Sequence, residues 1–350
     1  MPIKPLPHQD LADVFFHTRE LWAEARGRSF FITGGTGFFG IWLLESFTHI
    51  NDELGLDMRA VILTRDPVVF AQKAPHLTTR SDLQFIQGDV RSFTPPPGCY
   101  DYIIHAATEA SAKLNQESPE EMFDAIVGGT RRVLDFATKC GVRKFIVTSS
   151  GAVYGQQPSS LTHTPEDYLG APDPLLHNSA YGEGKRVSEH LCAVHASQHG
   201  YEVKIARCFA FVGPHLPLDG HFAIGNFIRD ALRDHPIQIA GDGTPMRSYL
   251  YASDLAIWLW TLLFRAPSAR AYNVGSADDL SIKQLASLVA TTVGNGAAIT
   301  VARSATPNSP VSRYVPAVNR AQDELGLVVT VNLPDALQRT AEWHKACVII

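Results

Sequence analysis

Short apolar segments alternate with helical segments over residues 29–205, and this alternation limits the possible folds more than any other feature of the chain. Strands that alternate with helices at this spacing pair in parallel, with helices on both faces of the sheet. The sequence therefore predicts an α/β fold with a doubly wound parallel sheet. The five expected strands lie within residues 29–33, 58–67, 82–90, 100–108 and 144–150.

A glycine-rich turn, GGTGFFG, follows the first expected strand and precedes a helical segment. It places Gly34, Gly37 and Gly40 at a strand-to-helix junction. Glycines let the backbone turn tightly and approach a pyrophosphate, which then binds free amide groups at the helix N-terminus. The motif predicts dinucleotide binding by this loop, which also contains Phe38 and Phe39.

The end of the second strand bears on the choice of dinucleotide. An acidic residue there would bind the ribose 2′-hydroxyl and indicate NAD. The sequence instead has Thr64 followed by Arg65, and a guanidinium can pair with a 2′-phosphate. We therefore expect NADP, with NAD as the second choice. The alternative interpretation is that Arg65 is only an exposed loop charge.

Two further strand ends belong to the expected cofactor site. Asp89 and Val90 end the third strand, where they are placed to flank an adenine ring. His105, Ala106 and Ala107 end the fourth strand beside the cofactor, where small residues permit close approach, and His105 is interpreted as structural rather than catalytic. Ligands of such sheets bind at the carboxyl ends of the strands. The elements expected to meet there are the glycine-rich loop, Arg65, Asp89, His105 and Ser150.

Tyr181 and Lys185 stand four residues apart at the start of an expected helix. This spacing places both side chains on one face, about 6 Å apart along the axis. A phenol is a useful base only if its pKa falls well below about 10, and a fixed ammonium nearby favours the phenolate. Ser150, at the end of the fifth strand, could hold a substrate hydroxyl against that phenolate. The alternative interpretation is an exposed helix pair without function.

Composition limits the partners and the compartment. The 350 residues include 30 basic and 35 acidic side chains and no basic block, which argues against nucleic acid as a partner. Five cysteines, odd in number and without a C-x-x-C pair, favour reduced thiols over a disulfide framework or a zinc site. The longest apolar run, residues 255–264, is too short to cross a bilayer. We expect a cytoplasmic protein with no metal, no membrane segment and no signal peptide.

Five motifs, TGGTGFFG, GDV, HAA, TSSGAVYG and YGEGK, occur in an order and spacing that resemble the extended short-chain dehydrogenase/reductases. Within these, the chain looks like the nucleotide-sugar epimerase/dehydratase branch over roughly residues 29–345. The resemblance implies Ser150, rather than Ser149, as the catalytic hydroxyl and Tyr181 as the base. It also implies that Lys185 lowers the pKa of that base and binds the nicotinamide ribose.

The resemblance also implies a domain organisation. A Rossmann-type dinucleotide-binding core is expected at residues 29–205, after an N-terminal helical extension at residues 1–28. A smaller, discontinuous substrate-binding lobe is expected mainly within residues 206–350, with residues 236–274 returning to the core.

The C-terminal half resembles the part of the family that binds a nucleotide-diphosphate sugar. By position, Asn226 and Arg247 match residues that meet the substrate diphosphate, and Arg313 resembles a second phosphate ligand. Arginine suits this role because its planar fork gives charged, bidentate recognition, although a surface ion pair is the alternative for each. A homodimer built on two long helices, near 117–140 and 181–199, is a further expectation from the family.

One departure from the family pattern bears on the reaction. Nucleotide-sugar 4,6-dehydratases place Asp-Glu directly after the catalytic hydroxyl, and UDP-glucuronate decarboxylases usually carry an acid there too. Gly151 and Ala152 occupy these positions here and can neither protonate a leaving hydroxyl nor remove a proton from C5. We therefore expect an epimerase or a 4-keto reductase that transfers hydride at C4. Glu109 matches a substrate-binding glutamate of the dehydratases, so a 4,6-dehydratase stays an alternative, as does a non-catalytic NAD(P)-binding protein.

Overall fold

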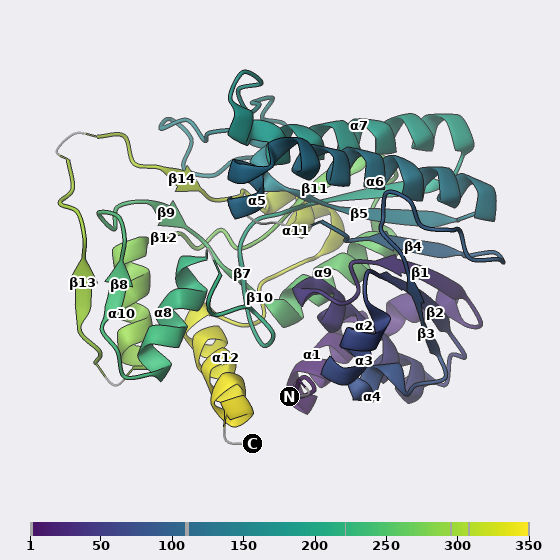
Figure 1. Cartoon of the computed structure of the whole chain (residues 1–350), viewed down its shortest axis with the longest axis horizontal. Coiled ribbons are helices and arrows are strands. Elements are labelled where there is room, and N and C mark those ends of the chain that lie inside the picture. The colour runs from purple at the N-terminus through teal and green to yellow at the C-terminus, as the bar shows by residue number, and fades with distance from the viewer. Residues whose placement is uncertain (1–2, 109–111, 221, 295, 307–308, 349–350) are drawn as a thin grey trace. The chain divides into compact units, whose positions relative to one another are not determined.

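The computed structural model describes residues 3–108, 112–220, 222–294, 296–306 and 309–348. The chain divides into two compact units (Figure 1). None of the described helices is long and apolar enough to cross a membrane. The first unit comprises Met1–Val153, Ala171–Arg207 and Ala256–Tyr272, and the second comprises Tyr154–Gly170, Cys208–Leu255 and Asn273–Ile350.

A seven-stranded sheet, in the order β11-β6-β5-β4-β1-β2-β3, forms the centre of the fold. Strands β1 to β5 pair in parallel, which confirms the predicted doubly wound sheet. The bounds of the strands are β1 Ser29–Thr33, β2 Arg59–Thr64, β3 Leu83–Gln87, β4 Tyr102–His105, β5 Lys144–Ser150, β6 Glu202–Cys208 and β11 Arg270–Val274.

The strand order reverses between β1 and β4. From β1 the chain builds outward to β2 and β3 on one side, and β4, β5 and β6 follow on the other. Thr33, the last residue of β1, lies in register with His105, the last residue of β4. Ligands of open α/β sheets bind beyond the carboxyl ends of the strands at such a reversal. The reversal therefore brings the glycine-rich turn beside the loop that follows His105.

Helices cover both faces of this sheet. On one face α6 (Pro119–Cys140) and α7 (Ala180–His199) lie along each other (Figure 1), over a core that includes Phe31, Phe136 and Val203. The other face carries α2 (Phe38–Leu54) and α9 (Ala252–Arg265). The indole nitrogen of Trp260 in α9 donates to Ser46 Oγ of α2, 2.9 Å away, deep in that layer.

The N-terminal segment forms α1 (His8–Thr18) and η1 (Arg19–Ala25), and it packs on the same layer as α9. Trp22 is fully buried, with its ring centroid 4.7 Å from that of Trp260. A buried aromatic contact of this kind contributes on the order of 1 kcal/mol beyond area burial. The shorter helices of the first unit are α3 Pro67–Lys73, α4 Pro75–Thr78, α5 Ala112–Glu117 and η3 His177–Ser179, and η2 Gly151–Tyr154 ends in the second unit.

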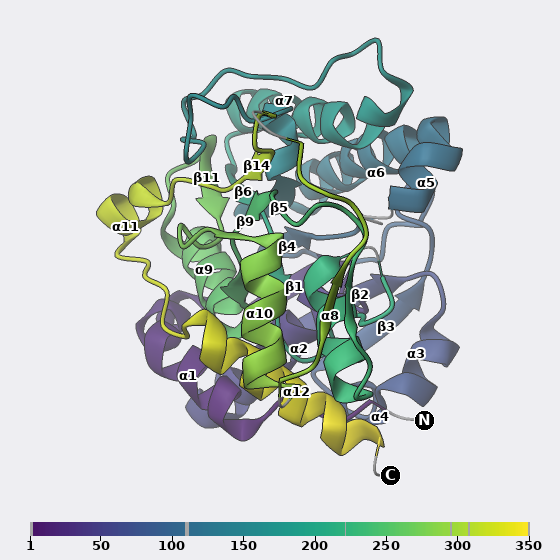
Figure 2. The ribbon, with the colours of Figure 1, turned by 90° about the vertical axis from the view of Figure 1, so that its left-hand side faces the viewer.

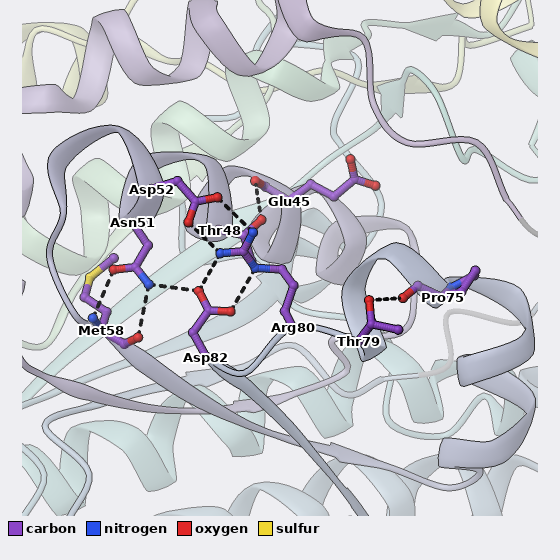
Figure 3. A network of polar contacts seen from close by, with 9 residues as sticks. All are labelled: Glu45, Thr48, Asn51, Asp52, Met58, Pro75, Thr79, Arg80 and Asp82. Atoms are coloured by element: carbon purple, nitrogen blue, oxygen red, sulfur yellow. Dashed lines mark hydrogen bonds and ion pairs between the residues drawn. The ribbon is translucent and has the colours of Figure 1, made fainter.

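The amino ends of β2 and β3 are held by a polar network around Arg80 (Figure 3). The guanidinium donates to both carboxylate oxygens of Asp82, at 2.8 Å each, and to both of Asp52, at 2.8 and 2.7 Å. The amide of Asn51 bonds the backbone of Met58 in both directions and also donates to Asp82. These contacts join the end of α2 to the starts of two strands.

Among its described residues, the second unit contains three small sheets and four complete helices. The parallel pair β7–β10, the group β12-β9-β14 and the parallel pair β13–β8 make up the sheets. Figure 2 shows α8, α10 and α12 side by side. The bounds are β7 Phe211–Val212, β8 Ile237–Ile239, β9 Met246–Arg247, β10 Leu250–Tyr251, β12 Leu280–Ser281, β13 Ile299–Val301, β14 Arg313–Tyr314, α8 Ala223–Leu232, α10 Ile282–Thr292, α11 Asn319–Leu325 and α12 Leu333–Val348.

Candidate active site

The glycine-rich loop lies against the backbone that follows β4. Gly34 has a positive φ of 76°, and a Cβ on it would lie 2.4 Å from the carbonyl carbon and oxygen of Ala106. A Cβ on Gly40 would lie 2.3 Å from the carbonyl oxygen of Gly34. Both approaches exclude any side chain. The loop ends at Gly37, the residue before α2, so bare backbone borders the N-terminus of this helix, the kind of site that binds a pyrophosphate.

The end of β2 presents Arg65 at the surface, next to a buried Thr64. The following carboxylate, Asp66, caps α3 by accepting from the backbone amide of Val69 at 2.8 Å. Gln87 of β3 donates to the carbonyl of Arg65, which ties this turn to the neighbouring strand end. These contacts hold the backbone of the turn that carries the exposed Arg65 side chain at the carboxyl end of β2.

Asp89 is engaged by a residue that sequence reasoning missed. Arg91 donates to its two carboxylate oxygens, at 2.9 and 3.0 Å. These hydrogen bonds hold the pKa of Asp89 below its usual value against the opposing effect of burial, and the charge of Arg65 acts in the same direction. Asp89 therefore carries a negative charge at the strand end. Its neighbour Val90 packs on α6, where a Cβ on Gly129 would lie 2.8 Å from Val90 Cγ1.

His105 is buried at the end of β4, with 3% of its surface exposed. Its Nδ1 lies 2.8 Å from Thr33 Oγ1, and its Nε2 lies 3.1 Å from Thr130 Oγ1 on α6. Burial lowers its pKa to about 3, and the charge of Lys185 adds to this shift. The imidazole is therefore neutral at any ordinary pH.

Lys185 is buried in α7, and its ammonium reaches two oxygen acceptors. It donates to Thr108 Oγ1 at 2.8 Å and to the backbone carbonyl of Thr148 at 2.7 Å. The same nitrogen lies 5.9 Å from the centroid of the Tyr181 ring. The one-turn spacing read from the sequence thus places a fixed positive charge beside the phenol.

The start of α7 is fixed by Asn115 of α5. Ser179, the residue before the helix, makes no side-chain cap. Instead, the Asn115 side chain accepts from the backbone amide of Tyr181 at 3.0 Å and donates to the carbonyl of Asn178 at 2.6 Å. The turn that carries the phenol is therefore tied to the segment that follows the β4 loop.

The two serines at the end of β5 have different surroundings, because successive strand residues point to opposite faces. Ser149 donates to Glu189 Oε1 at 2.6 Å, and Glu189 is paired with Arg207 at 2.7 Å. Ser150 instead accepts from the backbone amide of Ala152 at 3.2 Å.

The second unit contains the residues assigned to the substrate diphosphate. Arg247 donates to the carbonyl oxygens of Met246 and Ser312, and no carboxylate of the described residues lies within ion-pair distance of it. Burial lowers its pKa below the usual value, an effect that Tyr249 and Tyr314 oppose. A half-buried guanidinium held by carbonyls has charge left for an anionic ligand.

The other two candidates of this unit are already engaged by side chains. Arg313 is paired with Asp279 at 2.7 Å, and Asn226 accepts from Arg229 at 3.1 Å. Glu109, the remaining candidate, lies outside the described residues.

The carboxyl end of the sheet therefore brings together the glycine-rich loop, the β4 loop and Lys185 through direct contacts. Sequence reasoning missed the polar side chains that organise this end. Thr108 offered a weak signal, since it directly follows the H-A-A turn, whereas the others gave none. The missed residues are Thr33, Arg91, Thr108, Asn115, Thr130 and Ser188.

The chain matches a known family over most of its length. A model of the NAD dependent epimerase/dehydratase family matches residues 30–275. UDP-glucuronic acid decarboxylase 1 of Arabidopsis thaliana is 30% identical over 309 residues, which cover 88% of this chain and 68% of that protein.

Solved structures of similar fold also cover most of the chain. MoeE5, in complex with UDP-glucuronic acid and NAD, has a TM-score of 0.75 and 25% identity, covering 91% of this chain and 99% of that one. The UDP-glucuronic acid 4-epimerase of Bacillus cereus has a TM-score of 0.76 and 22% identity over the same shares, which shows a common fold.

Proposed function

The chain belongs to the NAD dependent epimerase/dehydratase family, and we propose that it transfers hydride at C4 of a nucleotide-diphosphate sugar, as an epimerase or a 4-keto reductase. The observation that carries this proposal is the buried Lys185 ammonium, 5.9 Å from the Tyr181 ring. A fixed cation beside the ring favours the phenolate, and a phenolate can act as the base that oxidation of a sugar hydroxyl requires.

The proposed chemistry gives each residue one task. Tyr181, as phenolate, accepts the proton of the C4 hydroxyl, and Lys185 stabilises the phenolate before that transfer. Ser150 donates a hydrogen bond to the same sugar oxygen and orients it. A bound nicotinamide dinucleotide supplies the hydride acceptor and a positive charge near the phenol. In an epimerase the keto-sugar rotates in the site, so that hydride returns to its opposite face. A reductase begins from the keto-sugar.

Gly151 and Ala152 support reaction at C4 alone. No carboxylate follows Ser150, and the amide of Ala152 is committed to the serine oxygen. A 4,6-dehydratase needs an acid for the leaving hydroxyl and a base for the C5 proton, and neither residue supplies one. That reaction, and a non-catalytic dinucleotide-binding role, remain the weaker alternatives.

Decarboxylation is the second candidate, because the relatives named above are UDP-glucuronic acid decarboxylases. A 4-keto hexuronate is a β-keto acid, so its C6 carboxylate can leave as carbon dioxide without removal of the C5 proton. The same Tyr181, Lys185 and Ser150 would perform the oxidation. The lack of an acid at residues 151 and 152, where such enzymes usually carry one, weighs against this reaction.

We propose NADP as the preferred dinucleotide, on the strength of Arg65 at the end of β2. NAD is the competing choice, since MoeE5 is in complex with NAD. Arg247 is proposed as the diphosphate ligand, and a homodimer built on α6 and α7 is also proposed. Mass spectrometry of the nucleotide released from denatured protein would identify a retained dinucleotide directly.

Product analysis in heavy water separates the proposed reactions. UDP-glucose and UDP-glucuronic acid are incubated with the protein and either dinucleotide in D₂O, and products are identified by NMR. An epimer with hydrogen retained at C4 and C5 supports the proposal, because the hydride returns from the dinucleotide. For the reductase form, a UDP-4-keto-hexose is the substrate instead. Its reduction with consumption of NADPH likewise supports the proposal.

Other products would identify the alternatives. Deuterium at C5 with loss of carbon dioxide indicates a decarboxylase, and deuterium at C5 in a 6-deoxy-4-keto sugar indicates a dehydratase. Turnover that survives Tyr181→Phe would overturn the assignment of the base. If the protein binds the dinucleotide but neither converts any of these sugars nor reduces the dinucleotide, the proposed chemistry on these sugars is contradicted.

A further inference from the structure

We infer that His105 is a positioning residue that sits, as the neutral Nε2–H tautomer, in a ring of hydrogen bonds, completed by one turn of the α7 backbone, that fixes the Lys185 ammonium. The inference rests on the proposed function, since it concerns the cation assigned to the Tyr181 base. The ring passes through β1, β4, α6 and α7, and the side chains that these four elements contribute to it are all buried.

The first half of the ring sets the direction of the hydrogen bonds around the imidazole. The backbone amide of Ala107 donates to Thr33 Oγ1 at 3.3 Å, so this hydroxyl accepts one bond. Its own proton then goes to His105 Nδ1, 2.8 Å away. A neutral imidazole has one donor and one acceptor nitrogen. Nε2 therefore carries the proton and donates to Thr130 Oγ1 at 3.1 Å.

The second half of the ring continues in the same direction. Thr130 lies 2.9 Å from Ser188 Oγ, and Ser188 in turn donates to the carbonyl of Ile126 at 3.5 Å. With the Nε2–H tautomer, each hydroxyl donates one bond. With the opposite tautomer, the buried Thr33 hydroxyl would have no acceptor among its contacts in the described part of the chain, and Ser188 would donate to Thr130 instead of to the Ile126 carbonyl. An unmade buried hydrogen bond costs about 1–3 kcal/mol, so the Nε2–H form is favoured.

The ring closes on Lys185 from two sides. Ser188 lies one turn after Lys185 on α7, so its bond to Thr130 fixes that part of the helix. On the other side Lys185 donates to Thr108 Oγ1, which itself donates to the carbonyl of Ala107 at 2.9 Å. The Ala107 amide donates to Thr33, which bonds His105. The loop that follows β4 is thus linked to the imidazole through Thr33 as well as through the chain.

The neutral state of His105 is part of this function. Lys185 of α7 is the charged group that acts on it, whereas Thr33 of β1 and Thr130 of α6 face it with hydroxyls and Phe145 of β5 with a ring. A protonated imidazole would have to donate from both nitrogens. It would then reverse the Thr33 bond and place a second cation near the ammonium.

The tautomer can be tested without any substrate. Long-range proton–nitrogen NMR spectra of the full chain labelled with ¹⁵N-histidine distinguish the two nitrogens, and loss of one signal set in His105→Gln assigns them. We expect a protonated Nε2 and an unprotonated Nδ1, unchanged between about pH 5 and pH 9. A protonated Nδ1, or titration within that range, would overturn the inference whatever the reaction proves to be.

The positioning role is tested by a matched pair at the centre of the ring. Thr130→Val removes the hydroxyl between His105 and Ser188 at nearly constant shape, and Thr130→Ser restores it. With whichever of UDP-glucose and UDP-glucuronic acid is turned over, we expect Thr130→Val to lower kcat about tenfold and leave KM within about twofold. The acid limb of its pH profile should move upward by about half a unit or more, because a less fixed ammonium lowers the phenol pKa less.

Three outcomes decide this test. Recovery of both kcat and the pH profile in Thr130→Ser supports the ring. A Thr130→Val protein that melts earlier but keeps the wild-type kcat and pH profile shows a structural hydroxyl only and overturns the inference. If Tyr181→Phe also turns over normally, the proposed base is wrong, and the NMR result alone then decides the tautomer.

Discussion

At the carboxyl end of the sheet Lys185 donates to two neutral oxygens, whereas at the amino end Arg80 donates to two carboxylates (Figure 3). Both side chains belong to the same unit and both join helices to strands. Thr108 and Thr148 accept from the Lys185 ammonium through a hydroxyl and a carbonyl oxygen, which carry dipoles but no net charge. The bonds to Asp52 and Asp82 use the hydrogen-bond donors of the Arg80 guanidinium and neutralise its charge.

This difference shows how the two ends of one sheet can serve different purposes, stability at the amino end and chemistry at the carboxyl end. A cation paired with carboxylates has its field cancelled and serves to join chain segments. A cation held by hydroxyl and carbonyl dipoles keeps its field and can lower the pKa of a nearby phenol. The arginines of the second unit show the same contrast, since Arg247 is held by carbonyls and Arg313 by Asp279.

The largest expected effect is at the phenol beside Lys185. Tyr181→Phe removes the proposed base and should lower kcat by about 10² to 10⁴-fold, the usual contribution of a general base. The dissociation constant of the dinucleotide, measured by fluorescence titration with NADPH or NADH, should change little. Tyr100→Phe is the control, because this phenol precedes β4 at the amino end of the sheet, where its hydroxyl donates to the carbonyl of Pro97. Equal losses of kcat in both variants would remove the contrast between the two ends of the sheet.

The next effect concerns the two arginines of the second unit. Arg247→Met should raise KM for the nucleotide sugar by about 10- to 100-fold, because a charge-assisted hydrogen bond to phosphate contributes roughly 1.5–3 kcal/mol. Arg313→Met should raise it by about fivefold or less, since its guanidinium is paired with Asp279. Steady-state kinetics on both variants measure the difference. A larger increase in KM for Arg313→Met would show that Arg313 leaves Asp279 and binds the substrate.

At the amino end of the sheet we expect a loss of stability without a loss of turnover. Arg80→Met leaves Asp82, of which 13% is exposed, beside an apolar chain. This should lower the free energy of unfolding by about 1–3 kcal/mol, between the values for exposed and buried pairs. Urea denaturation measures it. Arg59→Met, which removes an exposed pair with Asp57, should cost less than about 0.5 kcal/mol. Equal costs for the two variants contradict this account of the network.

The smallest expected effect is a pH dependence of stability from the same network. Burial raises the pKa of Asp82, but hydrogen bonds from Arg80 and Asn51 outweigh burial and hold that pKa below its usual value. Such a carboxylate adds stability above its unfolded pKa of about 4, and this stability is lost as the pH falls through the lower folded pKa. Unfolding free energies of wild type should therefore fall more steeply than those of Asp82→Asn below about pH 4. Parallel curves would show that Asp82 contributes nothing to acid sensitivity.

Sequence reasoning reached the features that local patterns encode. The strands of the sheet follow from short apolar segments between helices, and the close approach at Gly34 follows from glycine at a strand-to-helix turn. The proximity of Tyr181 and Lys185 follows from helical spacing alone. Each of these depends on residues that are neighbours in the chain.

The contacts that organise the site could not be reached in this way. Lys185 and Thr108 are 77 residues apart, and Thr130 and Ser188 are 58 apart. No local pattern selects these hydroxyls from the others in the chain. The pair of Arg313 with Asp279, 34 residues apart, likewise changes the environment of a residue whose type was identified correctly.

The central claim is that Lys185 is held for chemistry and Arg80 for stability. The most direct test measures kcat and the free energy of unfolding for Lys185→Met and Arg80→Met side by side. We predict that Lys185→Met loses at least about 100-fold in kcat and less stability than Arg80→Met, because it leaves neutral oxygens rather than carboxylates without a donor. Arg80→Met should show the reverse. A Lys185→Met enzyme that turns over normally, or that loses as much stability as Arg80→Met, would contradict the account.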